Sequence, residues 1–386
     1  MHNEIICRLE AVWRRTLRVD GPVPLHAPVF EGHEWEYVKD CLDTGWVSSV
    51  GAYVDRFEAM LADITGAHHA VATVNGSAAL EVCLHLAGVG AGDDVVLPSL
   101  TFIATANAVS HLGASCRFVD VDEATLGLDP ARLDDHLARH GDRPIKAVVV
   151  MHTFGHAADL DGLMQVCARH GVPLIEDAAE SLGSYSGGRH TGTSGLLSAL
   201  SFNGNKIVTT GGGGAVLTND PDLARRAKHL TTTAKLSHPY RFDHDEVGWN
   251  YRLPNLNAAL GCAQLEALPA YLGRKRRLAS LYQEAFADLP GVKVVADRAG
   301  CAGNFWLNAL ILDRPDRDLV AQVIEGAAAR GLQCRPIWTP MHRLPMYRYC
   351  PRDDLAVTEA LEDRLINIPS SPSPVLDAVI SAGAGL

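Results

Sequence analysis

An alternation of apolar runs and helical patterns is clearest in residues 69–113, which read HAVATVNGSAALEVCLHLAGVGAGDDVVLPSLTFIATANAVSHLG. Two compact apolar runs, at 69–74 and 94–98, have the length and composition of buried strands. Each run is followed by a segment with apolar residues at three- and four-residue spacing, at 77–88 and 102–113. Both segments end in glycine, a common helix stop. The pattern predicts two successive strand–helix units.

The same alternation continues beyond this stretch and predicts an α/β fold with a mostly parallel sheet covered on both faces. Further strands are expected at 116–121, 145–151 and 172–177, and further helices at 130–141 and 160–171. In such sheets, ligands bind at the carboxyl ends of the strands, where loops lead into helices. A functional site is therefore expected along that edge.

A polar and aromatic stretch at 234–255 interrupts the alternation, and an α+β pattern follows it. The expected later elements are a helix from Asn255, helices at 274–289, 316–330 and near 355–366, and strands at 292–296, 305–312 and 332–338. We therefore predict a large α/β domain at 24–262 and a smaller α+β domain at 263–386. Residues 1–23 are expected to pack on the smaller domain.

The composition of the 386-residue chain argues against several classes of function. It has 34 Lys+Arg against 45 Asp+Glu, a formal net charge of -11, and no basic run, so we expect no nucleic-acid or membrane partner. No apolar stretch approaches the roughly 20 residues of a membrane-spanning helix, and the N-terminus lacks the pattern of a secretory signal. The nine cysteines form no C-x-x-C pair, so we expect a cytoplasmic protein with reduced thiols. The closest histidine pair, His68 and His69, would point to opposite faces of a strand, and we expect no metal site.

The most informative segment is SFNGNKIVTTGGGG (201–214), in which Lys206 stands between a strand-like run and a glycine cluster. A solvated surface position is the ordinary interpretation of a lone lysine. Lys206, however, is flanked by small and apolar residues. A buried lysine loses its charge easily, and a neutral amine is a nucleophile toward aldehydes. Lys206 is therefore a candidate for a lysine that forms a Schiff base.

A second segment, VPLIEDAAESLGS (172–184), places Asp177 at the end of an apolar strand. The ordinary alternative is that Asp177 is the N-cap of a helix. The functional interpretation is an acceptor for a pyridinium N–H, because a nearby carboxylate keeps the ring protonated and the ring then withdraws electrons from a carbanion. Glu176 and Glu180 flank Asp177 and are further candidates for the site. The alternative is that both are solvated charges at the start of a helix.

Two further segments suggest a phosphate site and a stacking ring. In VNGSAALEV (74–82), Gly76 and Ser77 form a turn at which a helix opens, and the backbone N–H groups of a helix start bind phosphate. Many strand–helix turns look like this, so the signal alone is weak. Phe102 follows the end of a strand. A phenylalanine there is more often part of the core, and the functional alternative is a ring that stacks on a cofactor.

A nucleophilic lysine, a ring-nitrogen acid, a phosphate cup and a stacking ring are the parts that a pyridoxal phosphate site needs. From about Pro24 to Pro369, the sequence resembles the DegT/DnrJ/EryC1/StrS family of sugar aminotransferases, which are fold-type I pyridoxal phosphate enzymes. The resemblance is carried by GWVSSVGAYVDRFE, VNGSAAL, TFIATANA, MHTFGH, IEDAAESLGS, SFNGNK, TTGGGG and GWNYRLPNLNAALG. It implies a large domain with a mostly parallel seven-stranded sheet flanked by helices, plus a smaller α+β C-terminal domain.

The resemblance also implies roles for residues at matching positions. Lys206 would bind the cofactor and move a proton, Asp177 would pair with the pyridine nitrogen, and Phe102 would lie over the ring. The phosphate would be held by Gly76, Ser77, Ala78 and Ser201. Glu180 stands beside the cofactor where many relatives carry Gln or His. Asn250, in the G-x-N-x-R pattern of GWNYR, would reach the phosphate of the neighbouring subunit, which implies a homodimer with shared active sites.

Two details narrow the resemblance. Some relatives that dehydrate sugars carry His in place of Lys206, and the glycine run 211–214 lacks the Glu that the family usually has. With MHTFGH, HLTTTAK, RPIW and NIPSS, these details resemble the branch that serves bacillosamine and legionaminic acid synthesis. The resemblance then implies ping-pong transfer of an amino group from L-glutamate to C4 of a nucleotide-linked 4-keto-6-deoxy-2-acetamido hexose. The residues considered for binding this substrate are Lys235, Arg252, Arg335 and His342.

Several other functions stay open at this point. They include an aminotransferase on another nucleotide keto-sugar, a pyridoxal phosphate-dependent sugar dehydratase, and a regulator that retains the cofactor site. A nicotinamide oxidoreductase on the doubly wound sheet is a weaker alternative, because no G-x-G-x-x-G follows the first strand. A non-catalytic scaffold would leave Lys206 in its small-residue setting unexplained.

Overall fold

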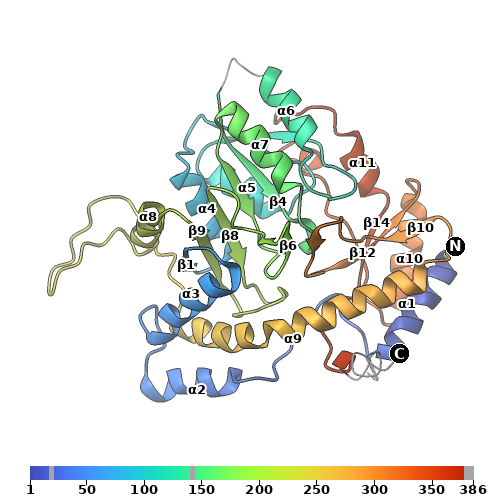
Figure 1. Ribbon diagram of the computed structural model, residues 1–386, viewed down its shortest axis with the longest axis horizontal. Helices are drawn as coiled ribbons and strands as arrows, with labels where there is room; N and C mark the ends of the chain where they lie inside the picture. The colour runs from blue at the N-terminus through green and yellow to red at the C-terminus, as the bar shows by residue number, and fades with distance from the viewer. Residues whose placement is uncertain (17–20, 140–143, 378–386) are drawn as a thin grey trace.

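The computed structural model describes residues 1–16, 21–139 and 144–377. Its largest sheet has seven strands in the order β1-β9-β8-β5-β4-β2-β3 (Figure 1). The strand bounds are β1 His69–Thr73, β2 Asp94–Pro98, β3 Ser115–Val119, β4 Ile145–Met151, β5 Leu174–Asp177, β8 Leu197–Ser201 and β9 Gly214–Thr218. Six of the seven strands run in the same direction, and β9 is antiparallel to both of its neighbours, β1 and β8. The predicted mostly parallel, seven-stranded α/β sheet is confirmed.

Helices cover both faces of this sheet, which explains why its strands are apolar throughout. Val95 and Leu97 of β2 pack in one core with α4 and α5, whereas Val96 packs in a second core with α6 and α7. The helix bounds are α4 Gly76–Leu86, α5 Ile103–His111, α6 Pro130–Arg139, α7 Leu160–His170 and α8 Pro221–Thr231. The first four agree with the predicted helices to within two residues at each end.

The chain reverses between β8 and β9, and this reversal carries Lys206. β9 is not among the predicted strands, because the glycines that lead into it weaken the strand signal. Gly214 lets the start of β9 approach the backbone before α4 closely, since a Cβ at this position would lie 2.4 Å from the carbonyl carbon of Asn75. Gly211 turns the chain with a φ of 77°, which glycine adopts without steric penalty. The glycine run therefore allows the lysine loop to pack tightly against the start of α4.

The C-terminal part contains a four-stranded antiparallel sheet in the order β10-β12-β14-β13. Its elements are β10 Val292–Val294, β12 Asn308–Leu312, β13 Arg335–Pro336, β14 Leu365–Ile368, α10 Arg317–Ala329 and α11 Ala356–Glu362. The helix expected near 355–366 is too long, because its last residues form β14 and pair with β12. A three-stranded sheet combines β11 Cys301–Ala302 with β6 Tyr185–Ser186 and β7 Arg189–His190.

A single long helix, α9 Asn255–Phe286, runs between the two parts (Figure 1). The prediction of two separate helices here is wrong, and Pro269 lies inside the helix. Leu265 and Tyr271 pack in the core next to β9, and Tyr282 packs in the core of the smaller sheet. This continuous packing offsets the backbone hydrogen bond that Pro269 removes. A domain division near residue 262 would fall within α9 and stays a prediction.

The N-terminal helices pack at the two ends of α9. Ile5 and Leu9 of α1 His2–Thr16 share a core with Tyr282, whose hydroxyl accepts a hydrogen bond from the indole of Trp13. Helices α2 Glu34–Thr44 and α3 Ala52–Thr65 contact the first half of α9. Short 3-10 turns occupy Thr153–Gly155 and Met341–Arg343. Among the described residues, no helix has the length and apolar character needed to cross a membrane.

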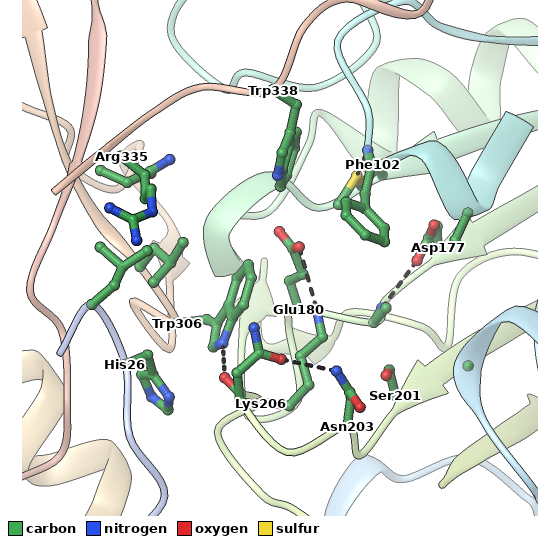
Figure 2. A pocket seen from close by; sticks show the side chains of 18 of the residues that line it. His26, Phe102, Asp177, Glu180, Ser201, Asn203, Lys206, Trp306, Arg335 and Trp338 are labelled. Carbon is green, nitrogen blue, oxygen red and sulfur yellow. Dashed lines mark hydrogen bonds and ion pairs between the residues drawn. The ribbon is translucent and has the colours of Figure 1, made fainter. Parts of the chain in front are cut away.

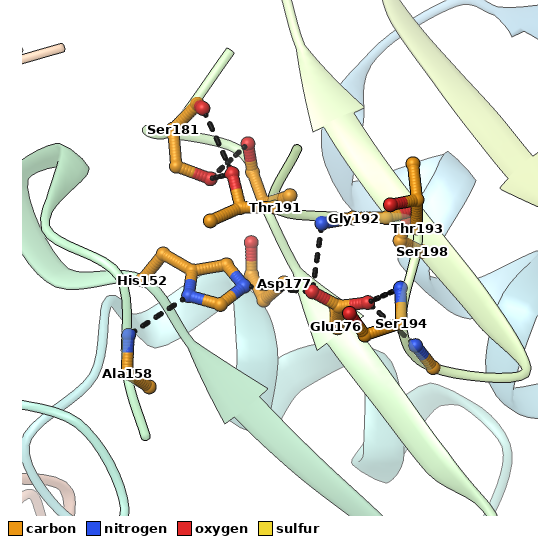
Figure 3. Close-up of polar contacts among 12 residues, drawn as sticks. His152, Ala158, Glu176, Asp177, Ser181, Thr191, Gly192, Thr193, Ser194 and Ser198 are labelled. Atoms are coloured by element: carbon orange, nitrogen blue, oxygen red, sulfur yellow. Dashed lines mark hydrogen bonds and ion pairs between the residues drawn. The ribbon is translucent and has the colours of Figure 1, made fainter. Parts of the chain in front are cut away.

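Glu176 on β5 is completely buried and ties this strand to the loop 192–195 (Figure 3). Its carboxylate accepts backbone N–H groups of Gly192, Ser194 and Gly195 at 2.7, 2.8 and 2.6 Å. His152 Nδ1 accepts the N–H of Ala158, so His152 Nε2 carries the hydrogen and donates it to Glu176 at 2.9 Å. Burial opposes the charge, yet these donors lower the pKa of Glu176 overall. Glu176 is therefore a structural anchor and not a solvated charge.

We expect Glu176→Gln to lower the free energy of unfolding by about 2–5 kcal/mol, because an amide NH2 would face donors that now point at a carboxylate. Urea unfolding of the cofactor-free protein measures the change. Glu325→Gln on the exposed face of α10 is the matched control and should change stability by less than about 0.5 kcal/mol. Equal stability of the two variants would contradict the anchoring role.

Candidate active site

A cavity of about 660 Å³ lies between the carboxyl edge of the seven-stranded sheet and the four-stranded sheet (Figure 2). The predicted site residues that line it are Gly76, Ser77, Phe102, Asp177, Glu180, Ser201, Lys206 and Arg335. They come from strand ends, loops and the first turn of α4, and they are up to 259 positions apart in the chain. The location agrees with the expectation that ligands bind at the carboxyl ends of parallel strands.

Lys206 is mostly buried, with 12% of its side chain exposed. Its Nζ lies 3.3 Å from Glu180 Oε1 and 3.9 Å from the centre of the Trp306 ring. A solvated surface lysine has neither a buried acid nor an aromatic face as its neighbour. The ordinary interpretation of Lys206 as a surface residue is therefore wrong, and its amine is available inside the cavity.

Glu180 is buried, and its second oxygen accepts the backbone N–H of Phe154 at 2.9 Å. Burial raises the pKa of Glu180 to about 7, although the charge of Lys206 and the N–H of Phe154 oppose that shift. Phe154 adopts a left-handed φ of 58°, which costs a non-glycine residue about 1–2 kcal/mol. This strained turn aims the N–H at Glu180 and helps to hold the carboxyl against the amine.

Asp177 ends β5 and no helix begins there, so the N-cap interpretation is wrong. Its carboxylate accepts a hydrogen bond from Thr105 Oγ1 at 2.7 Å and from the N–H of Ala179 at 3.2 Å. Two donors leave lone pairs on the carboxylate for a third one. Asp177 lines the cavity, so a donor on a bound ring can reach that remaining acceptor.

The start of α4 forms a cup for an anion. Asn75 caps the helix, and its side-chain oxygen accepts the N–H of Ala78 at 2.8 Å, so the Ala78 amide is already engaged. Gly76 and Ser77 line the cavity with Ser201 opposite, and a Cβ on Gly76 would lie 2.7 Å from Ser201 Cβ. The cup is thus as narrow as a glycine permits. Asparagine before Gly-Ser is the signal for the cap that sequence reasoning missed.

Aromatic side chains form the opposite boundary of the cavity. Phe102 is 46% exposed and packs edge-on against Trp338, with 5.9 Å between ring centres. Phe102 is therefore not a core residue. Trp306 and Trp338 also line the cavity, and the indole N–H of Trp306 donates to the carbonyl of Asn205 at 2.7 Å. The sequence does not predict them as site residues, because both lie in segments that it assigns to strands. The Trp306 ring covers one side of the Lys206 amine.

Ala78, whose N–H is engaged by Asn75, does not line this cavity, and four further predicted site residues lie away from it. Lys235 and Asn250 are exposed on the segment between α8 and α9; Lys235 packs on Phe242, and Asn250 accepts a hydrogen bond from Arg252 at 3.0 Å. His342 is buried, with hydrogen bonds to Ser99 and Glu359 of 2.7 and 3.1 Å. The structure does not bring them together with the cavity residues of the same chain.

A second buried lysine, Lys275 on α9, binds the backbone of a segment that lines the cavity. Its Nζ donates to the backbone carbonyls of Trp306 and Ser370 at 3.1 and 2.5 Å. Burial lowers the pKa of Lys275 well below its usual value. It does not line the cavity, so Lys206 is the buried lysine that a ligand there can reach.

Comparison with known proteins agrees with this geometry. The model of the DegT/DnrJ/EryC1/StrS aminotransferase family matches residues 29–381. The chain is 37% identical to the GDP-perosamine synthase of Caulobacter vibrioides over 93% of this chain and 97% of that protein. It is 35% identical to EpsN of Bacillus subtilis, whose name specifies pyridoxal phosphate dependence, over 92% of each chain. The structure of DesI in the presence of its TDP-sugar product is similar, with a TM-score of 0.83, 32% identity, and coverage of 97% of this chain and 94% of that chain.

The raised pKa of Glu180 gives a pH-dependent prediction for the cofactor-free protein. Because the folded state holds this proton more tightly than the unfolded chain, the stabilisation is complete below pH 4.5 and is lost as the pH rises to about 7. The glutamine side chain of the Glu180→Gln variant is neutral at every pH, so this variant does not lose that stabilisation as the pH rises. The free energy of unfolding of Glu180→Gln, relative to the parent, should therefore rise by about 2–3 kcal/mol between pH 5 and pH 8.

Urea unfolding at pH 5, 6, 7 and 8 measures this difference. The exposed variant Glu325→Gln controls for general effects of removing one carboxylate, and its difference from the parent should vary by less than about 0.5 kcal/mol. A difference between Glu180→Gln and the parent that does not change with pH would show that Glu180 is ionised throughout this range.

Proposed function

Because the chain belongs to the DegT/DnrJ/EryC1/StrS aminotransferase family, we propose that it moves an amino group from L-glutamate to C4 of a nucleotide-linked 4-keto-6-deoxy hexose. Its cofactor is pyridoxal phosphate. The observation that carries the proposal is the buried amine of Lys206 beside Glu180, in the same cavity as Asp177. A lysine and an acid so placed are what amino transfer with this cofactor requires.

The cavity residues fit this cofactor. Asp177 offers an acceptor for a pyridinium N–H, because its carboxylate is already oriented by Thr105 and Ala179. The phosphate is assigned to the cup formed by Gly76, Ser77 and Ser201, and the ring face to Phe102. Bound there, pyridoxal phosphate supplies an electrophilic carbon and an electron sink for the carbanion.

The side chains around Lys206 suit it for proton transfer. In this proposal Nζ of Lys206 takes the proton from Cα of glutamate, and in the second half-reaction it gives a proton to C4 of the sugar. Glu180 contacts Nζ and changes charge near neutral pH, so it can stabilise either protonation state of the amine. Trp306 lies over the amine and Trp338 lines the cavity, so in this proposal both side chains limit the access of water to a bound substrate.

Two features bear on the identity of the sugar acceptor. Similarity to a GDP-perosamine synthase favours a GDP-linked hexose. The motifs RPIW and NIPSS favour a 2-acetamido hexose of the bacillosamine and legionaminic acid type. Arg335 is exposed at the cavity, and its guanidinium donates to the carbonyl of Cys334 with no acid partner among the described residues. It is placed to bind the diphosphate or a carboxylate of glutamate.

The segment between α8 and α9 supports a homodimer with shared sites. It extends away from the body of the chain in Figure 1, and Tyr240, Phe242 and Val247 on it are 80%, 78% and 92% exposed. Exposed apolar side chains on an extended segment are typical of contact with another chain. We propose that this segment carries Asn250 to the phosphate cup of the partner subunit, with Lys235 and Arg252 near its substrate.

The proposed function predicts a two-stage result. Incubation with L-glutamate alone should convert the cofactor to its amino form, seen as loss of visible absorbance, with release of 2-oxoglutarate. Addition of GDP- and UDP-linked 4-keto-6-deoxy hexoses, with and without a 2-acetamido group, should then give a 4-amino sugar, identified by mass spectrometry, and regenerate the absorbance. Ping-pong kinetics should accompany this sequence.

Lys206→Ala is the control for the chemistry, and it should lower the rate by at least about 1000-fold. Lys293→Ala on β10, which removes an exposed lysine that does not line the cavity, should leave the rate within about twofold. Loss of a sugar hydroxyl without glutamate consumption would instead identify a dehydratase. Conversion by glutamate with no sugar accepted would overturn the proposed acceptor class.

A further inference from the structure

Two side chains in the cavity wall carry shielded polar atoms without a partner. Neither ring nitrogen of His26 makes a hydrogen bond of good geometry within the described residues, although the backbone of Asn205 lies near the ring, and both nitrogens are shielded from solvent. Asn367 is only 3% exposed and leaves its Oδ1 unpaired, while its Nδ2 lies 3.5 Å from the carbonyl oxygen of Pro336. Unpaired buried polar groups lower stability and are uncommon in folded proteins. Two of them in one cavity wall indicate a ligand that supplies the missing partners.

His26 and Asn367 lie on adjoining segments. The carbonyl of Leu25 accepts the N–H of Ser370 at 2.7 Å, which fixes His26 beside the end of β14, the strand that carries Asn367. Figure 2 shows His26 across the cavity from Asp177. This wall is therefore separate from the residues assigned to the pyridine nitrogen and the phosphate, and it is free for the part of a substrate that points away from them.

The chemistry of this wall favours a neutral ligand group. Burial, reinforced by the charges of Lys275 and Lys206, holds the pKa of His26 well below its usual value, so the ring is uncharged. A neutral imidazole offers one donor and one acceptor, and Asn367 adds an acceptor. A hydroxyl both donates and accepts, so it matches this set. Phosphate and carboxylate groups accept only, and Arg335 suits them better.

We propose that His26 and Asn367 form a subsite that hydrogen-bonds hydroxyl groups of the sugar acceptor; the identity of the acceptor as a sugar rests on the proposed function. His26 is partly exposed while its nitrogens are shielded, so a turn about its Cβ–Cγ bond brings a nitrogen to the cavity surface. L-Glutamate has no hydroxyl group and does not use the subsite. His26 and Asn367 therefore determine which sugar is accepted and leave the first half-reaction unaffected.

The test compares two variants of the cofactor-loaded enzyme. His26→Phe keeps an aromatic ring but loses both polar atoms, whereas His26→Gln keeps a donor and an acceptor. Conversion of the cofactor by L-glutamate, measured without sugar, should stay within about twofold in both. The KM for the sugar that the acceptor panel identifies should rise about 10- to 100-fold in His26→Phe and less than about threefold in His26→Gln.

A second readout is independent of activity. The Tm of His26→Phe without sugar should equal or exceed that of the parent, because two unpaired nitrogens are gone. Asn367→Leu, which is close to isosteric, should show the same split between an unchanged glutamate step and a raised sugar KM. This variant tests the other half of the subsite.

Several results would overturn the inference. The first is an unchanged KM for the sugar in His26→Phe, and the second is a glutamate step that slows in this variant as much as the sugar step. The third is a Tm of His26→Phe several degrees below that of the parent, which would reveal that the His26 nitrogens have partners inside the protein. Failure of the proposed function is distinguishable, because the parent enzyme itself would then convert no sugar of the panel. In that case the hydroxyl subsite is overturned as well.

Discussion

The chemistry of the cavity depends on one buried pair, the amine of Lys206 and the carboxyl of Glu180, 3.3 Å apart. Neither group is well solvated, and the charge of Lys206 opposes the rise that burial causes in the pKa of Glu180. Burial brings the pKa of Glu180 to about 7, which lets it gain or lose its charge near neutral pH. In the proposed reaction, the adjacent amine alternates between accepting and donating a proton.

The surrounding fold holds this pair in place from three directions. Glu176 and His152 fix the end of β5, and with it the chain that leads to Glu180. The left-handed turn at Phe154 directs a backbone N–H to the carboxyl of Glu180. On the other side, Lys275 holds the carbonyl of Trp306, whose ring lies against the amine of Lys206. Each support is buried and polar, so breaking one leaves an unpaired group.

Local signals explain which features the sequence predicts. The apolar runs of β2 and β4 predict those strands with their observed bounds, and the order of short motifs predicts Lys206 and Asp177 as parts of one site. His26 and Trp306 reach the cavity only after the N-terminal segment and the smaller sheet close over it, and no local pattern reports that closure. The positive charge of Lys235 suggests a role in substrate binding, but charge does not reveal the course of the segment that follows α8, where Lys235 lies outside the cavity.

Reductive trapping tests the central role of Lys206 most directly. The protein loaded with pyridoxal phosphate is treated with sodium borohydride, digested, and mapped by mass spectrometry, so that the lysine bound to the cofactor is permanently marked. The adduct should lie on the peptide that contains Lys206, because its amine is the buried one that opens into the cavity. An adduct on Lys275, or only on exposed lysines, would contradict the assignment.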